Sequence, residues 1–149
     1  MSRKCDAWLS RIKAVERDYV ATHLALEELL LAAQRNPAVL RGRVEVRHLD
    51  QALEGLQATY LIRLFAEFES GLREFWRASR RGRIPRTEHL LTGIAAARGV
   101  PDEDLLSAHA VRRHRNSLVH DQEEAAATIP LRTARGHLCR FFSRLPPTW

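Results

Sequence analysis

The sequence predicts an all-α fold, a bundle of four or five helices that forms a single domain over residues 1–149. Two observations support this prediction. Apolar residues recur at spacings of three and four along most of the chain, and no stretch of useful length alternates between apolar and polar residues as a strand does. Gly- and Pro-containing stretches interrupt the pattern and mark helix ends. With 149 residues, 45% of them hydrophobic, the chain is long enough to form one core.

Two long helices are expected first, and short loops favour an antiparallel arrangement of such neighbours. The first covers about residues 5–34, where the apolar face is Trp8, Ile12, Val15, Tyr19, Leu26, Leu29, Leu30 and Ala33. It ends at RNPAVLRG, because Pro37 disfavours a helical conformation at Asn36. The second covers about residues 44–79, where Leu49, Leu53, Leu56, Tyr60, Leu64, Phe68, Leu72 and Phe75 keep the helical period. A basic loop with the sequence RRGRIPR follows.

Three shorter helices are expected in the second half of the chain. Thr87 is expected to cap a helix with the sequence EHLLTGIAAAR that ends at Gly99. The next begins after Pro101 with three acidic residues, carries basic residues in its later turns as the helix dipole favours, and ends near His120 or Asp121. Thr128 and Pro130 open the last helix, whose apolar face is Leu131, Leu138, Phe141, Phe142 and Leu145.

Composition narrows the class of protein. The 24 Lys and Arg residues exceed the 18 Asp and Glu residues, and the net charge of +6 permits a polyanionic partner such as RNA. An Arg-rich chain from a GC-rich genome would have the same composition, so both interpretations remain open. Cys5 and Cys139 have no metal-ligand spacing, and we expect free thiols, no metal and no cofactor. No apolar run is long enough to span a membrane, which favours a cytoplasmic protein.

The densest set of reactive side chains is RRHRNSLVHD, residues 112–121. Asn116 and His120 are four residues apart, so they stack on one polar helix face. Arg115 falls in the apolar sector and needs a partner, because a buried unpaired charge is costly. Glu69 is the acid on the inward face of the second long helix, and we hypothesise that it pairs with Arg115. The alternative is that each side chain reaches the edge of the bundle independently.

The stretch RNSLVH reads as Arg-Asn-x-x-x-His near the end of a late helix in a small all-α protein. This pattern resembles the HEPN family (higher eukaryotes and prokaryotes nucleotide-binding), whose ribonuclease members carry an Arg-x4-6-His motif. The stretch LIRLFAEFESGLREFW is similar to the aromatic-rich long helix of HEPN-type proteins. As a helical bundle, the whole chain is similar to this family. The part of the resemblance that is specific to the family is the six residues RNSLVH.

The resemblance implies a metal-independent endoribonuclease that uses the RNA 2′-hydroxyl as nucleophile and leaves a 2′,3′-cyclic phosphate. The catalytic residues would be His120 as general acid and base, Arg115 on the scissile phosphate, Asn116 beside the imidazole, and Glu69 behind Arg115. The family also implies a homodimer in which a second copy completes the site. The same resemblance implies a defence or toxin-type role, with a cognate antitoxin or a nucleotidyltransferase protein as partner.

Further basic residues around the motif are expected to contact RNA if RNA is the ligand, and otherwise to be solvated surface residues. On the motif helix these are Arg112, Arg113 and His114, and in the RRGRIPR loop they are Arg81 and Arg83. On an ideal helix, Arg115 and His120 are about 140° apart around the axis and about 7.5 Å apart along it. This separation fits a composite dimer site, and it fits Arg115 as a structural anchor equally well.

Two other classes of function remain open. The first is a non-catalytic HEPN-like module that binds RNA, a nucleotide or a partner protein, with the motif serving packing and dimerisation. The second is a helical interaction protein in which RNSLVH occurs by coincidence.

Overall fold

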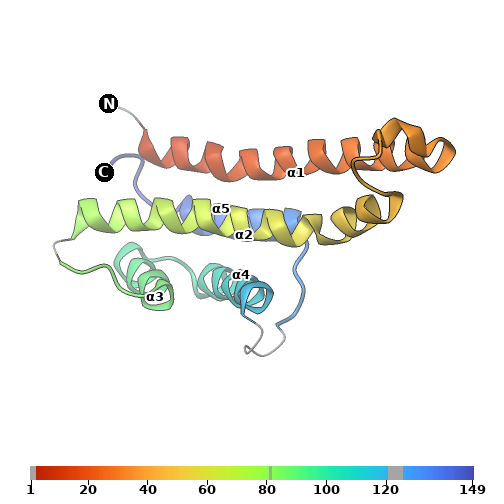
Figure 1. Ribbon diagram of the computed structural model, residues 1–149. Helices are drawn as coiled ribbons and strands as arrows, with labels where there is room; N and C mark the ends of the chain where they lie inside the picture. The colour runs from red at the N-terminus through yellow and green to blue at the C-terminus, as the bar shows by residue number, and fades with distance from the viewer. Residues whose placement is uncertain (1–2, 81, 121–125) are drawn as a thin grey trace.

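The computed structural model describes residues 3–80, 82–120 and 126–149 (Figure 1). These residues form five α-helices, which are α1 (Lys4–Arg35), α2 (Val46–Ser79), α3 (Thr87–Arg98), α4 (Asp102–Val119) and α5 (Leu131–Phe142), and one short 3-10 helix, η1 (Pro37–Leu40). The described residues contain no strand, so the prediction of an all-α bundle with four or five helices is confirmed, and the described residues form five.

The first two helices form a long antiparallel hairpin (Figure 1). Asn36 ends α1 with an extended backbone, and its side chain accepts a hydrogen bond from the Ala38 N–H in η1. Arg41 then takes a left-handed conformation with φ of 53°. The second helix begins at Val46, two residues later than predicted, because Glu45 and His48 form a reciprocal capping box at its start.

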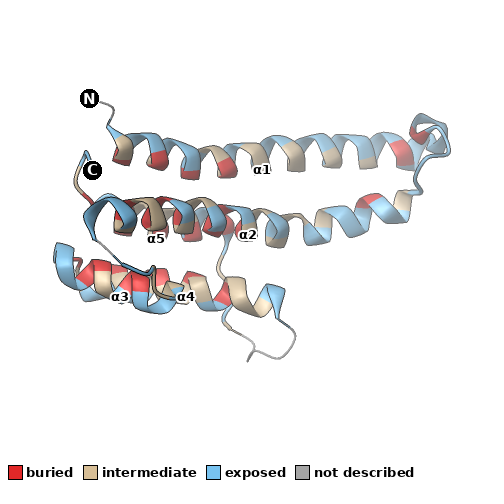
Figure 2. Ribbon diagram, turned by 60° about the vertical axis from the view of Figure 1, so that its left-hand side comes forward, coloured by how far each residue is buried: buried red, intermediate tan, exposed pale blue. Residues whose placement is uncertain are grey.

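The helices lie in three layers (Figure 1). One outer layer is α1, the middle layer holds α2 and α5, and the other outer layer holds α3 and α4. The half of the hairpin that includes η1 extends beyond the other helices, and its surface is mostly exposed (Figure 2). Leu29, expected on the apolar face of the first helix, is therefore 38% exposed.

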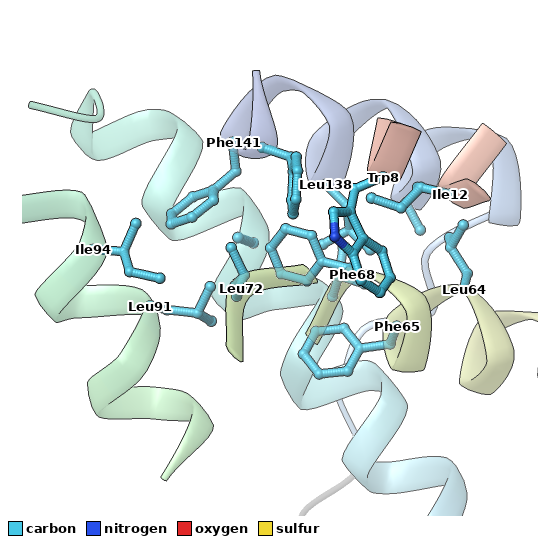
Figure 3. Close-up of a cluster of buried hydrophobic side chains, with 14 of the residues drawn as sticks. Trp8, Ile12, Leu64, Phe65, Phe68, Leu72, Leu91, Ile94, Leu138 and Phe141 are labelled. Carbon is cyan, nitrogen blue, oxygen red and sulfur yellow. The ribbon is translucent and has the colours of Figure 1, made fainter. Parts of the chain in front are cut away.

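The core lies where α2 meets the other four helices (Figure 3). The ring of Phe68 packs edge-on against Phe141 and Phe142, with centroids 5.7 and 6.1 Å apart. Close approach between α2 and its neighbours requires Gly71, because a Cβ there would lie 2.7 Å from the Phe142 ring. The predicted apolar face of the last helix is buried at all five of its positions, Leu131, Leu138, Phe141, Phe142 and Leu145.

The shorter helices begin and end close to the predicted positions, with two corrections. Thr87 does not cap α3: Arg86 precedes the helix, and no side chain caps its start. The fourth helix ends at Val119, so His120 has an extended backbone with φ of −122° and ψ of 112°. Gly99 ends α3 in the left-handed conformation, as expected for a C-terminal glycine, with φ of 63°.

Candidate functional site

A polar pocket of about 330 Å³ lies where α2, the start of α3 and the second half of α4 meet. This volume is near the lower end of the range for small-molecule sites. Three of its residues, Glu69, Arg115 and Asn116, are predicted catalytic residues, and a fourth, Arg112, is a predicted RNA contact. The complete lining is Phe65, Glu69, Arg86, Thr87, Glu88, Arg112, Arg115 and Asn116.

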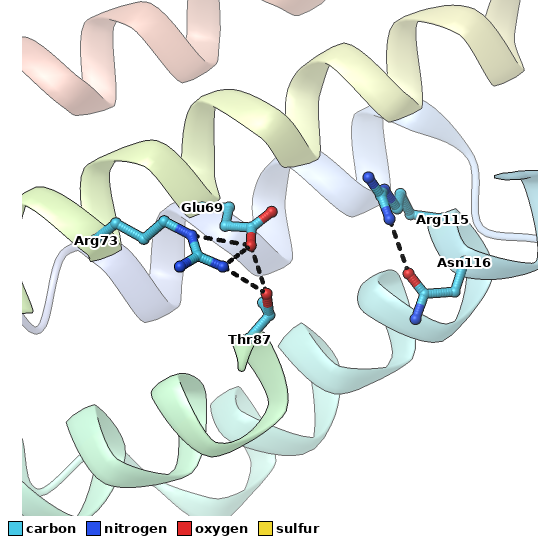
Figure 4. Close-up of polar contacts among 5 residues, drawn as sticks. All are labelled: Glu69, Arg73, Thr87, Arg115 and Asn116. Atoms are coloured by element: carbon cyan, nitrogen blue, oxygen red, sulfur yellow. Dashed lines mark hydrogen bonds and ion pairs between the residues drawn. The ribbon is translucent and has the colours of Figure 1, made fainter. Parts of the chain in front are cut away.

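Glu69 is held firmly on one side of this pocket (Figure 4). One carboxylate oxygen accepts hydrogen bonds from Arg73 Nε and Nη2, at 3.1 and 2.7 Å, and a third from the Thr87 hydroxyl. Burial opposes ionisation of the carboxyl. The hydrogen bonds from Thr87 and Arg73 and the charges of Arg73 and Arg115 outweigh burial, so the pKa of Glu69 lies below its ordinary value. Glu69 is therefore ionised at neutral pH.

The predicted pair between Glu69 and Arg115 is wrong in its direct form. Within the part of the chain that the structure describes, the partners of Glu69 are Arg73 and Thr87. Arg73 is one helical turn further along α2, at the spacing that favours an ion pair, and therefore reaches the carboxylate first. Arg115 lines the same pocket from α4 and acts on Glu69 through its charge, which contributes to lowering the Glu69 pKa.

Arg115 has few partners of its own. Its Nη1 donates a hydrogen bond of 3.1 Å to Asn116 Oδ1, and its guanidinium carbon is 6.0 Å from the centre of the Phe65 ring (Figure 4 shows the Asn116 bond). Its Nε is buried and makes no hydrogen bond to any described residue. Arg115 thus brings a positive charge to the pocket that no carboxylate of a described residue neutralises by a direct ion pair, which favours an anionic ligand.

Arg112 adds a second donor of the same kind. Its side chain is 17% exposed and lies 3.6 Å from a carboxylate oxygen of Glu88, at the edge of hydrogen-bonding range. Its Nε, like that of Arg115, is buried and makes no hydrogen bond to a described residue. With Arg86 also in the lining, three guanidinium groups face two carboxylates, and Arg73 neutralises one of the two. The local charge favours an anionic ligand.

His120 lies outside the pocket lining, one residue beyond the end of α4. Its backbone N–H donates a 2.9 Å hydrogen bond to the Asn116 carbonyl, so it follows the pocket residue Asn116 by one turn. Its side chain is exposed. Because α4 ends at Val119, the ideal-helix angle between Arg115 and His120 does not constrain where the imidazole points.

His114 is not a surface residue, contrary to prediction. It is 7% exposed, and its Nδ1 accepts a 3.1 Å hydrogen bond from the Ile129 N–H in the segment that leads into α5. Burial lowers the pKa of His114. The helix places His114 three residues after buried Val111, on the side covered by this segment, so an RNA contact at His114 is excluded by its burial.

The other predicted RNA contacts divide into two groups. Arg113 and Arg83 are exposed, which leaves both free to meet a polyanion, and Arg112 is partly buried in the pocket instead. Arg81 lies outside the described residues. Arg86, from the same basic loop as Arg83, reaches the pocket.

Sequence reasoning missed the contribution of α3 to the site. The sequence predicts a helix cap at Thr87, but its hydroxyl donates a hydrogen bond to Glu69, and its neighbours Arg86 and Glu88 also line the pocket. A local signal existed for Arg73, which follows Glu69 by four residues on α2. No local signal exists for Thr87, because its contact depends on how α3 packs against α2.

Comparisons of the chain with protein-family models, with curated proteins and with solved structures find no match. A separate search of the described helices finds none that is both long and apolar enough to cross a membrane.

Proposed function

We propose that this chain is a HEPN-like, metal-independent endoribonuclease whose pocket holds the scissile phosphate beside His120. The observation that carries the proposal is that Arg112 and Arg115 line one pocket, each with an Nε unpartnered among the described residues, and that Asn116 of the same pocket is one turn before the exposed His120. Arginine donors suit the tetrahedral oxygens of a phosphate, and they gain strength where water is excluded.

Each residue has a defined task in the proposed reaction. His120 accepts the proton of the 2′-hydroxyl, the 2′-oxygen attacks phosphorus, and the bond from phosphorus to the 5′-oxygen breaks. The products are a 2′,3′-cyclic phosphate and a 5′-hydroxyl, whose proton comes from protonated His120 or from water. Arg115 and Arg112 stabilise the charge that develops on the phosphate oxygens. Asn116 holds the guanidinium of Arg115, because its side-chain oxygen accepts a hydrogen bond from Arg115 Nη1.

Glu69 is a positioning residue in this scheme and makes no contact with the reacting atoms. Its ionised carboxylate binds Arg73 and Thr87, and it places a negative charge in the pocket with Arg115. Arg113 and Arg83, both exposed, would contact the RNA backbone away from the cleaved bond. A toxin-type role with a cognate antitoxin or nucleotidyltransferase partner belongs to the same proposal, as does completion of the site by a second copy.

A non-catalytic module that binds RNA or a nucleotide is the second candidate. One observation favours it: His120 does not line the pocket that collects the arginine donors. In that case the pocket would bind a phosphate group and leave it intact.

The decisive experiment is an RNA cleavage assay in EDTA with analysis of product ends. His120→Ala and Arg115→Ala are each expected to lower the rate by about 100-fold or more, with folding retained by circular dichroism. His89→Ala on α3 and Arg98→Ala at the end of α3 are matched controls, because both side chains are exposed and outside the pocket. Cyclic-phosphate ends are expected in the wild type.

Three other outcomes of this experiment would lead to a different conclusion about function. Binding of RNA that weakens in Arg115→Ala, without cleavage by any variant, would establish the binding module. Cleavage that persists in His120→Ala would overturn the assigned base. Absence of both binding and cleavage over a broad RNA panel would overturn the proposal as a whole.

A further inference from the structure

A second pocket, of about 250 Å³, lies between the last turns of α2 and α3. This end pocket is lined by Phe75, Trp76, Ser79, Arg80, Ile94, Ala97 and Arg98. It shares no lining residue with the candidate site, which is formed by α4 and by residues further from the ends of α2 and α3. Sites for drug-sized ligands begin at roughly 300 Å³, so the end pocket suits a smaller molecule.

The floor of the end pocket is apolar and firmly held. Phe75 and Ile94 are buried and belong to the main core. Phe75 also packs edge-on against Trp149, with ring centroids 5.3 Å apart. Trp76 lies against α3 at Gly93, where a Cβ would be 3.2 Å from the indole ring. Held aromatic side chains of this kind favour contact with a flat apolar group.

Two guanidinium groups line the same pocket from different helices. Arg80 directly follows α2, and its guanidinium carbon is 4.7 Å from the centre of the Trp76 ring, a cation–π contact that keeps the group beside the floor. Arg98 is the last residue of α3. None of the described lining residues is acidic. The acids of α2 and α3 that form ion pairs with described residues all bind other cations, and they are Glu67, Glu69, Glu74 and Glu88.

The charge of the end pocket is positive even when the helix dipoles are included. Both α2 and α3 end at this pocket, and the C-terminus of each carries about half a negative charge. The two arginines outweigh these partial charges and leave an excess of about one positive charge. Each guanidinium offers paired N–H donors that match the two oxygens of a carboxylate. The pocket therefore combines an aromatic floor with two exposed cationic groups.

We propose that the end pocket binds a small planar aromatic carboxylate. The ring of the ligand contacts Phe75, Trp76 and Ile94. Its carboxylate binds the guanidinium groups of Arg80 and Arg98. A neutral ring would lack the ionic contact, and a small inorganic anion would lack the apolar one. Because the end pocket is separate from the candidate site, this inference does not depend on the proposed ribonuclease activity.

The test is isothermal titration calorimetry of the full chain with indole-3-acetate and with the neutral indole-3-acetamide, which keeps the same ring. We expect a dissociation constant of about 1 mM or lower for indole-3-acetate. The amide is expected to bind at least about tenfold more weakly, because it loses the hydrogen bonds to a charged acceptor. Inorganic phosphate and adenosine monophosphate, as an anion without a ring and as a nucleotide, are both expected to bind more weakly than indole-3-acetate.

Two pairs of variants locate the binding site. Arg98→Gln is expected to weaken binding of indole-3-acetate at least about tenfold. Arg77→Gln is its control, because Arg77 is exposed in the last turn of α2 and lies outside the lining. Ala97→Phe is expected to abolish binding by filling the pocket, whereas Ala96→Phe changes an exposed residue outside the lining and should have no effect. Thermal unfolding checks that each variant keeps its fold.

Four outcomes would overturn the inference. The first is no binding of indole-3-acetate up to about 10 mM, by calorimetry and by ligand-observed NMR. Equal affinity for the amide would exclude the ionic contact with the arginines. Binding that survives Ala97→Phe would place the ligand elsewhere on the molecule. Tighter binding of phosphate or of adenosine monophosphate would exclude an aromatic carboxylate as the preferred class of ligand.

Discussion

The hydroxyl of Thr87, the first residue of α3, donates a hydrogen bond to the carboxylate of Glu69 in α2. This bond fastens the start of α3 to the middle helix at the wall of the pocket. Arg73 binds the same carboxylate oxygen and lies 3.4 Å from the Thr87 hydroxyl, which closes a three-residue network. The pocket therefore depends on a contact between residues 18 positions apart.

Removal of the Thr87 hydroxyl is expected to destabilise the protein. Thr87→Val keeps the shape of the side chain but leaves the partly buried Glu69 carboxylate with Arg73 as its donor, which costs about 1–2 kcal/mol. Thr92→Val is the matched control on the same helix, because the exposed Thr92 hydroxyl bonds only within α3 and to His109 at 3.5 Å. Urea unfolding measures the free energy of unfolding of both variants. Equal losses of stability in the two variants would contradict the assigned role of Thr87.

Glu69→Gln is expected to cost stability in a pH-dependent way. The fold holds the pKa of Glu69 below its ordinary value of about 4.5, so the carboxylate stabilises the fold above that pH. This stabilisation is lost as the pH falls through the lowered pKa, where wild-type Glu69 is itself protonated. We expect the wild type to be about 1–2 kcal/mol more stable than Glu69→Gln at pH 7, and the difference to shrink in acid.

Unfolding by urea at pH 7 and again below pH 4 checks the Glu69 prediction. Glu54→Gln is the control, because Glu54 is exposed on the same helix and forms no ion pair with a described residue. A wild-type advantage over Glu69→Gln that stays constant down to acidic pH would show that the ionised form is not the stabilising one.

His114→Gln is expected to flatten the pH dependence of stability below neutrality. Burial lowers the pKa of His114, so the neutral ring is favoured in the fold and accepts the Ile129 N–H bond. The resulting stabilisation is complete above the ordinary histidine pKa of about 6.5 and is lost as the pH falls through the lowered value. A glutamine oxygen can accept the same bond but does not titrate.

Thermal unfolding between pH 7 and pH 5 compares the two proteins. Burial also lowers the pKa values of His109 and His137, but both residues are present in wild type and variant, so the difference reports His114 alone. Identical slopes for the two proteins would exclude His114 as a source of the acid sensitivity.

Gly71→Ala is expected to destabilise the core although alanine favours helices. A Cβ at residue 71 would lie 2.7 Å from two atoms of the Phe142 ring and 3.0 Å from Trp8 Cδ2. Overpacking of this kind costs about 1–3 kcal/mol and exceeds the gain of up to about 1 kcal/mol in helix propensity. Gly55→Ala, also in α2, meets nothing within 4 Å and should stabilise the protein instead. We expect Gly71→Ala to lower the denaturant midpoint and Gly55→Ala to raise it. Stabilisation by both changes would contradict the close approach between Gly71 and the Phe142 ring.

Much of the fold could be predicted from local pattern. The observed α1 and α5 bury residues at the predicted apolar positions, and α2 begins only two residues after its predicted start. Local pattern works here because an amphipathic helix records its buried side in the spacing of its own residues. It failed at Leu29, which has the correct spacing but lies where the hairpin extends beyond the other helices.

The candidate site was likewise predictable only in part from local pattern. The sequence by itself determined that the chain is all-helical, that Asn116 and Arg115 lie late on one helix, and that Glu69 is on the inward side of another. Only the tertiary structure decided that Glu69 binds Arg73 and Thr87, that His114 is buried under the segment before α5, and that Arg86 joins the pocket. The physical reason is that helical period sets which side of a helix a residue takes. The height and rotation at which two helices pack decide which side chains meet, and these depend on the whole core.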